Sequence, residues 1–238
     1  MHSYFLSHLG NCDDNSEIEV EGDEARHMLR VLRARVGTIV RVFNGVGGSG
    51  KAQVIRIDGR QSARLKVLGY EEQSRGGLQI HIAVAVAKGD RFETMLDMLT
   101  QIGVDSITPI LFERSVVQTI KLERCQKIII EACKQSRRNW LPQLNNIIRL
   151  SDWHHTVADR PGIRWVADPS GQPFPVSNGL SDNSVSIVIG PEGGITEYEL
   201  ERLVESGFQS VKFNGPIMRI ETAAVAFASI AKLTSYAG

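Results

Sequence analysis

The sequence predicts a small β-domain at residues 1–73, followed by an α/β domain at residues 74–238 whose strands form a parallel sheet. Three observations support this division. Short apolar runs separated by glycine-rich or Asp-Gly turns fill the first part. In the second part, apolar runs alternate with segments of helix length. Between the two parts, residues 71–77 are polar and contain glycine, which is typical of a linker.

Three strands are expected in the first domain, at residues 38–43, 52–57 and 63–68, and they would form a small barrel or sandwich. The segment Gly45-Val-Gly-Gly-Ser-Gly50 lies between the first two and formally matches the GxGxxG pattern of dinucleotide-binding proteins. That pattern requires a strand before it and a helix after it. Because strands are expected on both sides here, we predict a hairpin loop.

The second domain opens with a nearly continuous apolar run at residues 80–87, as expected of a strand buried on both faces of a parallel sheet. The rest of the domain alternates between helix and strand. The expected helices lie at residues 90–102 and 121–137, and the further expected strands lie at residues 106–111, 163–167 and 185–189.

Charge is uneven along a chain that is neutral overall, with 27 basic and 27 acidic residues. Residues 1–25 contain seven acidic and no Lys or Arg side chains, whereas residues 26–66 contain ten Lys or Arg against one acid, Asp58. Such a cluster predicts a basic face that can bind a polyanion. The alternative is a set of solvated charges that pair with the acids in the folded protein.

Cysteines and apolar segments limit the class of protein. Cys12, Cys125 and Cys133 form no CxxC pair and no cluster with histidine, which argues against a disulfide framework and against a zinc site. The amino terminus lacks a basic segment followed by a long apolar run, and no stretch of about 18 apolar residues occurs. We therefore expect a cytoplasmic protein that needs no membrane and no metal.

Two segments near the carboxyl end predict a ligand-binding cleft. In the first, an apolar run ends at the glycines and proline of residues 190–194, and residues 196–199 read as a capping box that starts a helix. In the second, the strand-like residues 210–213 break at residues 214–216, and a helix rich in alanine follows. Glycines let backbone amides approach a ligand closely. By themselves, these features predict a small ligand at the ends of neighbouring strands.

These two segments resemble the signature loops of the bacterial 16S ribosomal RNA uracil-N3 methyltransferases, a branch of the knotted SPOUT class. Other segments match that family in the same order along the chain. They are His27-Met-Leu-Arg-Val-Leu-Arg33, Lys88-Gly-Asp-Arg91, residues 101–109, and residues 132–139 with Pro142. The chain departs from the family pattern at Met98, Gln101, Arg137, Asn214 and Pro216, where many members carry Lys, Glu, Gly, Gly and Arg.

The resemblance implies a PUA-like β-barrel that binds RNA at residues 1–73, and a SPOUT domain with a carboxy-terminal trefoil knot at residues 74–238. It implies S-adenosyl-L-methionine as the cofactor, bound at a homodimer interface, and 16S rRNA of the small ribosomal subunit as the partner. The residues expected to bind the cofactor are Ala167, Asp168, Gly190, Pro191, Glu192, Gly193, Gly194, Phe213, Asn214, Ile217, Met218 and Thr222.

Methylation of uracil at N3 requires loss of the N3 proton, which leaves negative charge on N3 and the two carbonyl oxygens. A fixed guanidinium stabilises such charge as it develops. Arg219 is therefore the expected electrostatic group, with Arg138, from the same or the other subunit, as its partner. Glu192 or Glu221 could accept the proton directly or through water. Glu221 is equally consistent with a residue that only favours the dipole of its helix.

His27, Arg30 and Arg33 fall at the helical spacings i, i+3 and i+6, which predicts a row on one helix face. Such a row can contact a phosphate backbone, which supplies affinity but no base identity. The base would be selected in the cleft of the second domain, after leaving its stack or from an unpaired position.

Two other functions fit the same residues. The first is a noncatalytic RNA-binding or ribosome-assembly factor that retains the fold, and the departures from the family pattern favour it. The second is a SPOUT methyltransferase that acts on another RNA position. Incorporation of methyl groups distinguishes the first from an enzyme, and the identity of the methylated nucleoside tests the second.

Overall fold

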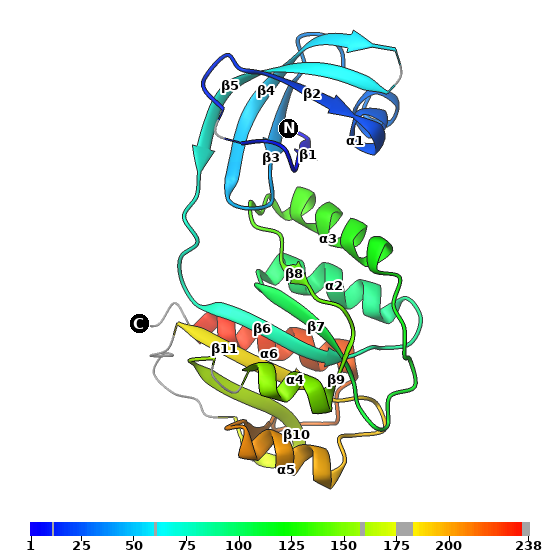
Figure 1. Ribbon diagram of the computed structural model, residues 1–238, viewed down its shortest axis with the longest axis vertical. Coiled ribbons are helices and arrows are strands. Elements are labelled where there is room, and N and C mark those ends of the chain that lie inside the picture. The colour runs from blue at the N-terminus through cyan, green and yellow to red at the C-terminus, as the bar shows by residue number, and fades with distance from the viewer. Residues whose placement is uncertain (11, 60, 158–159, 175–182, 235–238) are drawn as a thin grey trace. The chain divides into compact units, whose positions relative to one another are not determined.

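The computed structural model describes residues 1–238 except residues 11, 60, 158–159, 175–182 and 235–238 (Figure 1). By their contacts the residues divide into two compact units. The first comprises Met1–Gly76 and Cys133–Leu141, and the second comprises Gly77–Ala132 and Pro142–Gly238. The chain therefore contributes two separate segments to each unit.

A five-stranded sheet forms the first unit, in the order β1-β3-β4-β5-β2. The strands β1 and β3 are parallel, and the other pairs are antiparallel. The three expected strands are present as β3, β4 and β5, and two shorter strands flank them. The bounds are β1 Ser3–Phe5, β2 Glu17–Glu21, β3 Ile39–Phe43, β4 Gly48–Asp58 and β5 Ser62–Glu72.

A hairpin joins β3 to β4, as the flanking strands predict. Gly45 has φ 78° and Gly47 has φ 106°, a region that side chains disfavour. A Cβ atom on Gly45 would lie 2.6 Å from Leu141 Cδ1, and one on Gly47 would lie 2.6 Å from Trp140 Cζ2. The glycines are therefore needed to seat the segment Cys133–Leu141 within the first unit.

The expected helical row of His27, Arg30 and Arg33 is wrong in its geometry. Helix α1 spans Gly22–Arg26 and continues as a π-helix, η1, at His27–Val31. A π-helix is wider than an α-helix, so the i+3 and i+6 positions no longer align. Arg33 follows the helix with φ 50°, which ends any helical periodicity before it.

The second unit contains a parallel sheet in the order β12-β10-β11-β6-β7-β8, and β9 also pairs with β7. This arrangement confirms the predicted α/β class. The bounds are β6 Gln79–Ala85, β7 Ser106–Leu111, β8 Gln143–Leu144, β9 Ile148–Arg149, β10 Ile163–Pro173, β11 Ser184–Ile189 and β12 Gln209–Lys212.

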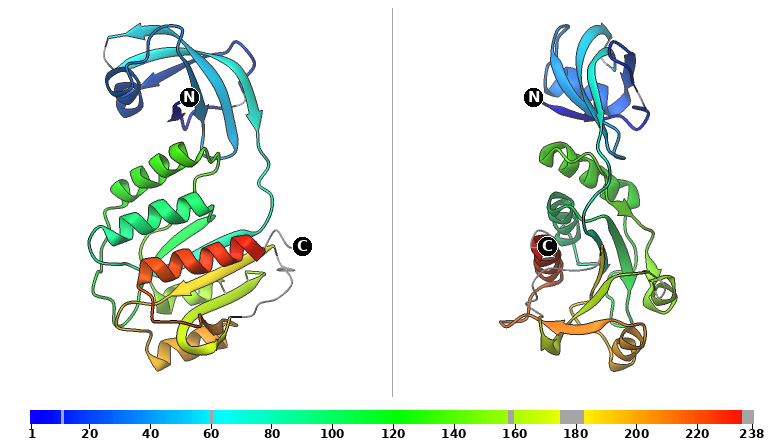
Figure 2. Two further views of the ribbon diagram at one scale, coloured as in Figure 1. Left: turned by 180° about the vertical axis from the view of Figure 1, so that it is seen from behind. Right: turned by 90° about the vertical axis from the view of Figure 1, so that its left-hand side faces the viewer.

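Helices cover both faces of this sheet. Figure 2 shows α2 and α6 side by side on one face, with α4 and α5 on the other. The bounds are α2 Arg91–Ile102, α3 Leu122–Ser136, α4 Leu150–Val157, α5 Glu197–Glu205 and α6 Ile220–Thr234. Within the described residues, no helix is long and apolar enough to cross a membrane.

The strand register brings three loops to one edge of the sheet: the irregular stretch at residues 168–171 within β10, and the loops that follow β11 and β12. Ala167 of β10 pairs with Ile189 of β11 on one side and with Val211 of β12 on the other. Since the strands are parallel, the segments that follow these residues emerge next to one another. Parallel sheets bind ligands at this edge, beyond the carboxyl ends of the strands.

Candidate functional site

The loop after β11 is shaped by its glycines and by the start of α5. A Cβ atom on Gly190 would collide with the side chain of Ile195, and Gly194 has φ 77°. Thr196 caps α5, since its hydroxyl accepts a hydrogen bond from Glu199 N (3.3 Å) and Thr196 N donates one to Glu199 Oε2 (3.0 Å). The predicted capping box is therefore confirmed, and it fixes where the loop ends.

Residues 113 and 114, which follow β7, form hydrogen bonds to the loop after β11 and to the start of α5. Arg114 Nη1 donates a hydrogen bond to Gly193 O over 3.0 Å. Glu113 N donates another to Glu199 Oε1 over 2.7 Å. A Cβ atom on Gly193 would lie 3.2 Å from Arg114 Cβ, so the two backbones pass close to each other. The side chain of Arg114, which no sequence pattern singled out, therefore helps to fix the loop.

Glu192 forms an ion pair with Arg91, with 2.7 Å between Glu192 Oε1 and Arg91 Nη1. The carboxylate of Glu192 is thus engaged by a guanidinium, which leaves it less available to a ligand. Arg91 belongs to the Lys88-Gly-Asp-Arg91 segment, which carried a family resemblance but no assigned role.

Asp168 lies where β10 loses its regular register, between Ala167 and Gln172. Its Oδ1 accepts hydrogen bonds from the backbone N (2.9 Å) and hydroxyl (2.7 Å) of Ser170, and its Oδ2 accepts one from the Ser210 hydroxyl over 2.6 Å. Burial alone would raise the pKa of Asp168, but these hydrogen bonds and the charge of Lys212 outweigh it and lower the pKa. Asp168 is therefore a fixed anion beside the three loops.

The loop after β12 is anchored at one end and open at the other. The ring of Phe213 packs edge-on against Phe227 of α6, with 4.8 Å between the ring centroids. Asn214 and Arg219 are exposed, and Ile217 is 85% exposed, the largest value among the exposed large apolar side chains of the described residues. Met218 is half-buried. This loop therefore presents both a guanidinium and an apolar side chain to the outside.

Glu221 and Thr222 lie in the first turn of α6, next to this loop. Glu221 is half-buried, whereas Thr222 is exposed. Glu221 Oε2 is buried and has no hydrogen-bond partner among the described residues. A buried carboxylate oxygen without a partner is costly. A group from outside the described residues is therefore expected to meet it.

Arg138 belongs to the first unit and Arg219 to the second, so their pairing stays a prediction. Arg138 N donates to Cys133 O over 3.0 Å, which places Arg138 just beyond the end of α3. Within the second unit, all the expected cofactor residues, Arg219 and Glu221 lie at or after the paired residues Ala167, Ile189 and Val211.

In the first unit, several members of the basic cluster are paired with acids. Arg26 pairs with Asp23, Arg56 pairs with Asp58 (2.7 Å) and Arg64 pairs with Glu17 (3.6 Å). For these three arginines, the alternative of paired surface charges holds.

The predicted RNA-contact residues differ in their exposure. Arg30 and Arg33 are exposed, whereas half-buried His27 packs edge-on against Tyr4, with 6.3 Å between the ring centroids. Arg30 and Arg33 are therefore better placed than His27 to contact a phosphate backbone.

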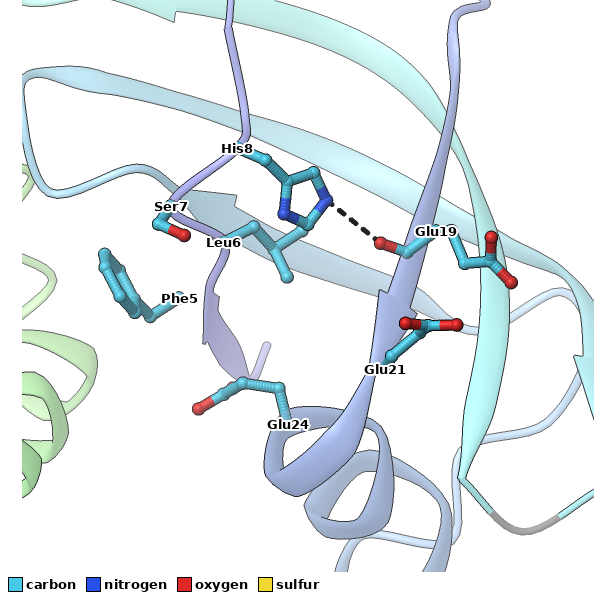
Figure 3. A pocket seen from close by; sticks show the side chains of 7 residues that line it. All are labelled: Phe5, Leu6, Ser7, His8, Glu19, Glu21 and Glu24. Atoms are coloured by element: carbon cyan, nitrogen blue, oxygen red, sulfur yellow. Dashed lines mark hydrogen bonds between the residues drawn. The ribbon is translucent and has the colours of Figure 1, made fainter.

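A hollow of about 390 Å³ also lies in the first unit (Figure 3). Glu19, Glu21 and Glu24 contribute three carboxylates to its lining, and the His8 ring contacts Glu19 O over 3.0 Å. Carboxylates repel phosphate, so this hollow is not where a phosphate backbone is expected. Across the described residues, no group of three or more His, Cys, Asp or Glu is placed to hold a metal ion.

Comparisons with known proteins agree with this architecture. The RNA methyltransferase domain family matches residues 74–232, and the RNA methyltransferase PUA domain family matches residues 20–68. The ribosomal RNA small subunit methyltransferase E of Rickettsia conorii is 31% identical, over 94% of this chain and 93% of the relative. The protein of the same name from Bacillus subtilis is 28% identical, over 86% and 85%.

A solved structure extends the comparison to three dimensions. The ribosomal RNA small subunit methyltransferase E from Neisseria gonorrhoeae, bound to S-adenosyl methionine, matches with a TM-score of 0.87 and 27% identity, over 98% of this chain and 97% of that one. With a PUA-like domain and an RNA methyltransferase domain of the SPOUT type, the chain belongs to the family of the ribosomal RNA small subunit methyltransferases E.

Proposed function

We propose that this protein transfers the methyl group of S-adenosylmethionine to N3 of a uridine in the 16S rRNA of the small ribosomal subunit. The observation that carries the proposal is the meeting of three loops beyond the paired residues Ala167 of β10, Ile189 of β11 and Val211 of β12. These loops, together with Ala167 of β10 and Thr222 of α6 beside them, hold the residues that the family resemblance assigns to the cofactor. Membership of the methyltransferase family supports the reaction class.

The residues present at this edge suit a cationic organic cofactor. Asp168 is an anion with a lowered pKa, and Glu221 carries a buried oxygen without a partner among the described residues. The glycine loop offers backbone amides and carbonyls, and Ile217 and Met218 offer apolar contact. When bound, S-adenosylmethionine supplies a methyl group on a positively charged sulfur.

The chain itself must handle the N3 proton and the charge that its loss creates. Between the two candidate acceptors, Glu221 is favoured, since Glu192 is paired with Arg91. Glu221 takes the N3 proton, and the guanidinium of Arg219 stabilises the charge spread over N3 and the two carbonyl oxygens. The loops after β11 and β12 contain no cysteine, so transfer proceeds without a covalent enzyme intermediate.

A homodimer in the cytoplasm is part of this proposal. Ile217 before α6 and Leu233 near its end are the two most exposed large apolar side chains of the described residues, at 85% and 73%. Covering them in a second subunit would remove apolar area from water. Arg138 would then act from the same or the other subunit, and the carboxy-terminal knot stays an expectation from the family.

Transfer of radiolabelled methyl from S-adenosylmethionine to small-subunit particles tests the proposal. The particles come from cells that lack the protein, and the product is digested and identified as a nucleoside. We expect N3-methyluridine. A different methylated nucleoside would contradict the target, and absence of label from both naked RNA and particles that the protein binds tightly would favour a noncatalytic factor.

A further inference from the structure

A second cavity, of about 340 Å³, lies in the second unit on the face of the sheet that α4 covers. Its lining includes His81 near the start of β6, Ser106 at the start of β7, and Trp153 of α4. The three loops of the proposed methyltransferase site instead follow the carboxyl ends of the strands. The volume lies at the lower end of the range of ligand pockets, roughly 300 to 1,000 Å³.

A row of the sheet that reaches this cavity through His81 and Ser106 is unusually polar for a parallel sheet. Strands buried on both faces are normally near-continuous apolar runs. Here one register row pairs Arg164 with Ser186, Ser186 with His81, and His81 with Ser106 across four strands. Thr108, one row further along β7, is also polar and buried. Polar groups in such a place lower stability unless they find partners, so the row calls for an explanation.

Hydrogen bonds orient the polar side chains of the cavity and leave the Thr108 hydroxyl proton for a further acceptor. His81 Nδ1 and Ser106 Oγ are 2.7 Å apart. Asn145 Nδ2 donates to Thr108 Oγ1 over 2.7 Å, so the Thr108 hydroxyl acts there as an acceptor. Its own proton therefore remains for donation to a further acceptor.

The charge of the lining points to an anion. Arg160 contributes a guanidinium, and the described residues that line the cavity include no Asp or Glu. Burial lowers the pKa of Arg160. A partly buried guanidinium with no ion-pair partner among the described residues is a ready site for an oxyanion, which it can bind in a bidentate manner.

We infer that this cavity binds a small organic anion, with its oxyanion head at Arg160 and the Thr108 hydroxyl and its flat or apolar body against Trp153 and Ile148. The head is a phosphate monoester or a carboxylate, since both offer oxygen acceptors to the same donors. The site is independent of the proposed methyl transfer, because none of its residues belongs to the three loops.

Isothermal titration calorimetry with ring compounds that differ only in the head group tests this inference. The probes are phenyl phosphate, benzoate and phenol, titrated into the full-length protein with S-adenosylhomocysteine present to fill the proposed cofactor site. We expect phenyl phosphate or benzoate to bind one to one with a Kd of about 1 mM or tighter, and phenol to bind at least tenfold more weakly. The better of the two anions identifies the head group.

Variants locate the binding. Arg160→Gln removes the charge, Thr108→Val removes the hydroxyl with little change in volume, and Arg149→Gln is the control, because Arg149 is exposed and does not line the cavity. Affinity is expected to fall about tenfold in Arg160→Gln and to stay unchanged in the control. Circular dichroism shows which variants fold. If Arg160→Gln does not fold, the affinity of Thr108→Val provides the test.

Either of two results would overturn the inference. One is the absence of saturable binding of both anions up to about 10 mM, since a built site of this size should bind more tightly. The other is binding that a folded Arg160→Gln or Thr108→Val variant leaves unchanged, which would place the anion elsewhere. Methyl transfer need not be measured, so failure here leaves the proposed function untouched.

Discussion

Arg114 donates a hydrogen bond from Nη1 to the carbonyl oxygen of Gly193 over 3.0 Å, although 79 residues separate the two in the chain. The contact ties the segment after β7 to the loop after β11, and these strands are not neighbours in the sheet. A loop that is already ordered loses less entropy when it binds a ligand. The contact therefore bears directly on cofactor affinity.

Replacing Arg114 with Ala should weaken binding of S-adenosylmethionine by about fivefold. One exposed charge-assisted hydrogen bond contributes about 1 kcal/mol, and its loss loosens the Gly193 backbone. Isothermal titration calorimetry measures the affinity, with Arg149→Ala as the control, since Arg149 is exposed and lies outside the loops. Equal affinities in the two variants would mean that the loop holds its shape without Arg114.

Replacing Arg219 with Ala should lower kcat by about 100-fold. The substitution removes a cationic hydrogen-bond donor that stabilises negative charge in the transition state. Arg219 is exposed, so the free energy of unfolding should stay within about 0.5 kcal/mol. Single-turnover methyl transfer is the measurement. Arg202→Ala serves as the control, because Arg202 is an exposed arginine of α5 that pairs with Glu205. Full turnover by a folded Arg219→Ala protein would remove Arg219 from the reaction.

Replacing Arg137 with Gly should raise the free energy of unfolding by about 0.5 to 1 kcal/mol. Arg137 has φ 57°, a conformation that costs a side chain roughly 1 to 2 kcal/mol, and the extra freedom of glycine in the unfolded state offsets part of the gain. Urea denaturation measures the change. Ser136→Gly, one residue earlier in α3, should instead be destabilising. A loss of stability in both variants would show that the Arg137 side chain makes a compensating contact.

The stability that Asp168 contributes should depend on pH. Its pKa is lower in the folded protein than its ordinary value of 3.8, so the contribution is present above that value and is lost as the pH falls through the lowered one. Asp168→Asn should therefore lower the free energy of unfolding by about 1 kcal/mol at pH 7 and by less at pH 3. Exposed Glu201 provides the control, Glu201→Gln. If Asp168→Asn lost the same unfolding free energy at pH 7 and at pH 3, the stabilisation would not depend on an ionised carboxylate.

Replacing both Arg30 and Arg33 with Gln should weaken RNA binding and flatten its dependence on salt. Each lost phosphate contact reduces the slope of log K against log salt by about one. Filter binding between about 50 and 200 mM salt measures the slope, and Arg56→Gln is the control, since Arg56 already pairs with Asp58. An unchanged slope in the double variant would exclude both residues from the interface.

Local patterns in the sequence predicted much of the second unit. The strand at Ser106–Leu111 and the capping box of Thr196 and Glu199 occur where they were expected, because apolar runs and caps depend on neighbouring residues. The segments that carry the expected cofactor residues follow paired positions of three neighbouring strands, and their role in cofactor binding stays a prediction. Arg91 and Arg114 could not be found this way, since their partners, Glu192 and Gly193, are distant in the sequence.

One example from each unit shows where local patterns fail. Arg33 was placed on a helix face because its spacing fits 3.6 residues per turn, but the helix widens at His27 and ends before Arg33. The strand expected to end at residue 167 continues to Pro173 after an irregular register, which hydrogen bonds to Asp168 accompany. Both departures depend on tertiary contacts and hydrogen bonds that hydrophobic periodicity does not encode.

The glycine hairpin that receives Trp140 and Leu141 also has a consequence for synthesis on the ribosome. The amino-terminal sheet emerges first, but the residues that fill the space over Gly45 and Gly47 are made about 70 codons after the end of β5. Until they leave the exit tunnel, the contacts of Trp140 and Leu141 with this hairpin cannot form. A fragment that stops at residue 76 would lack those contacts permanently, so expressing the amino-terminal half requires residues 133–141 to be supplied as well.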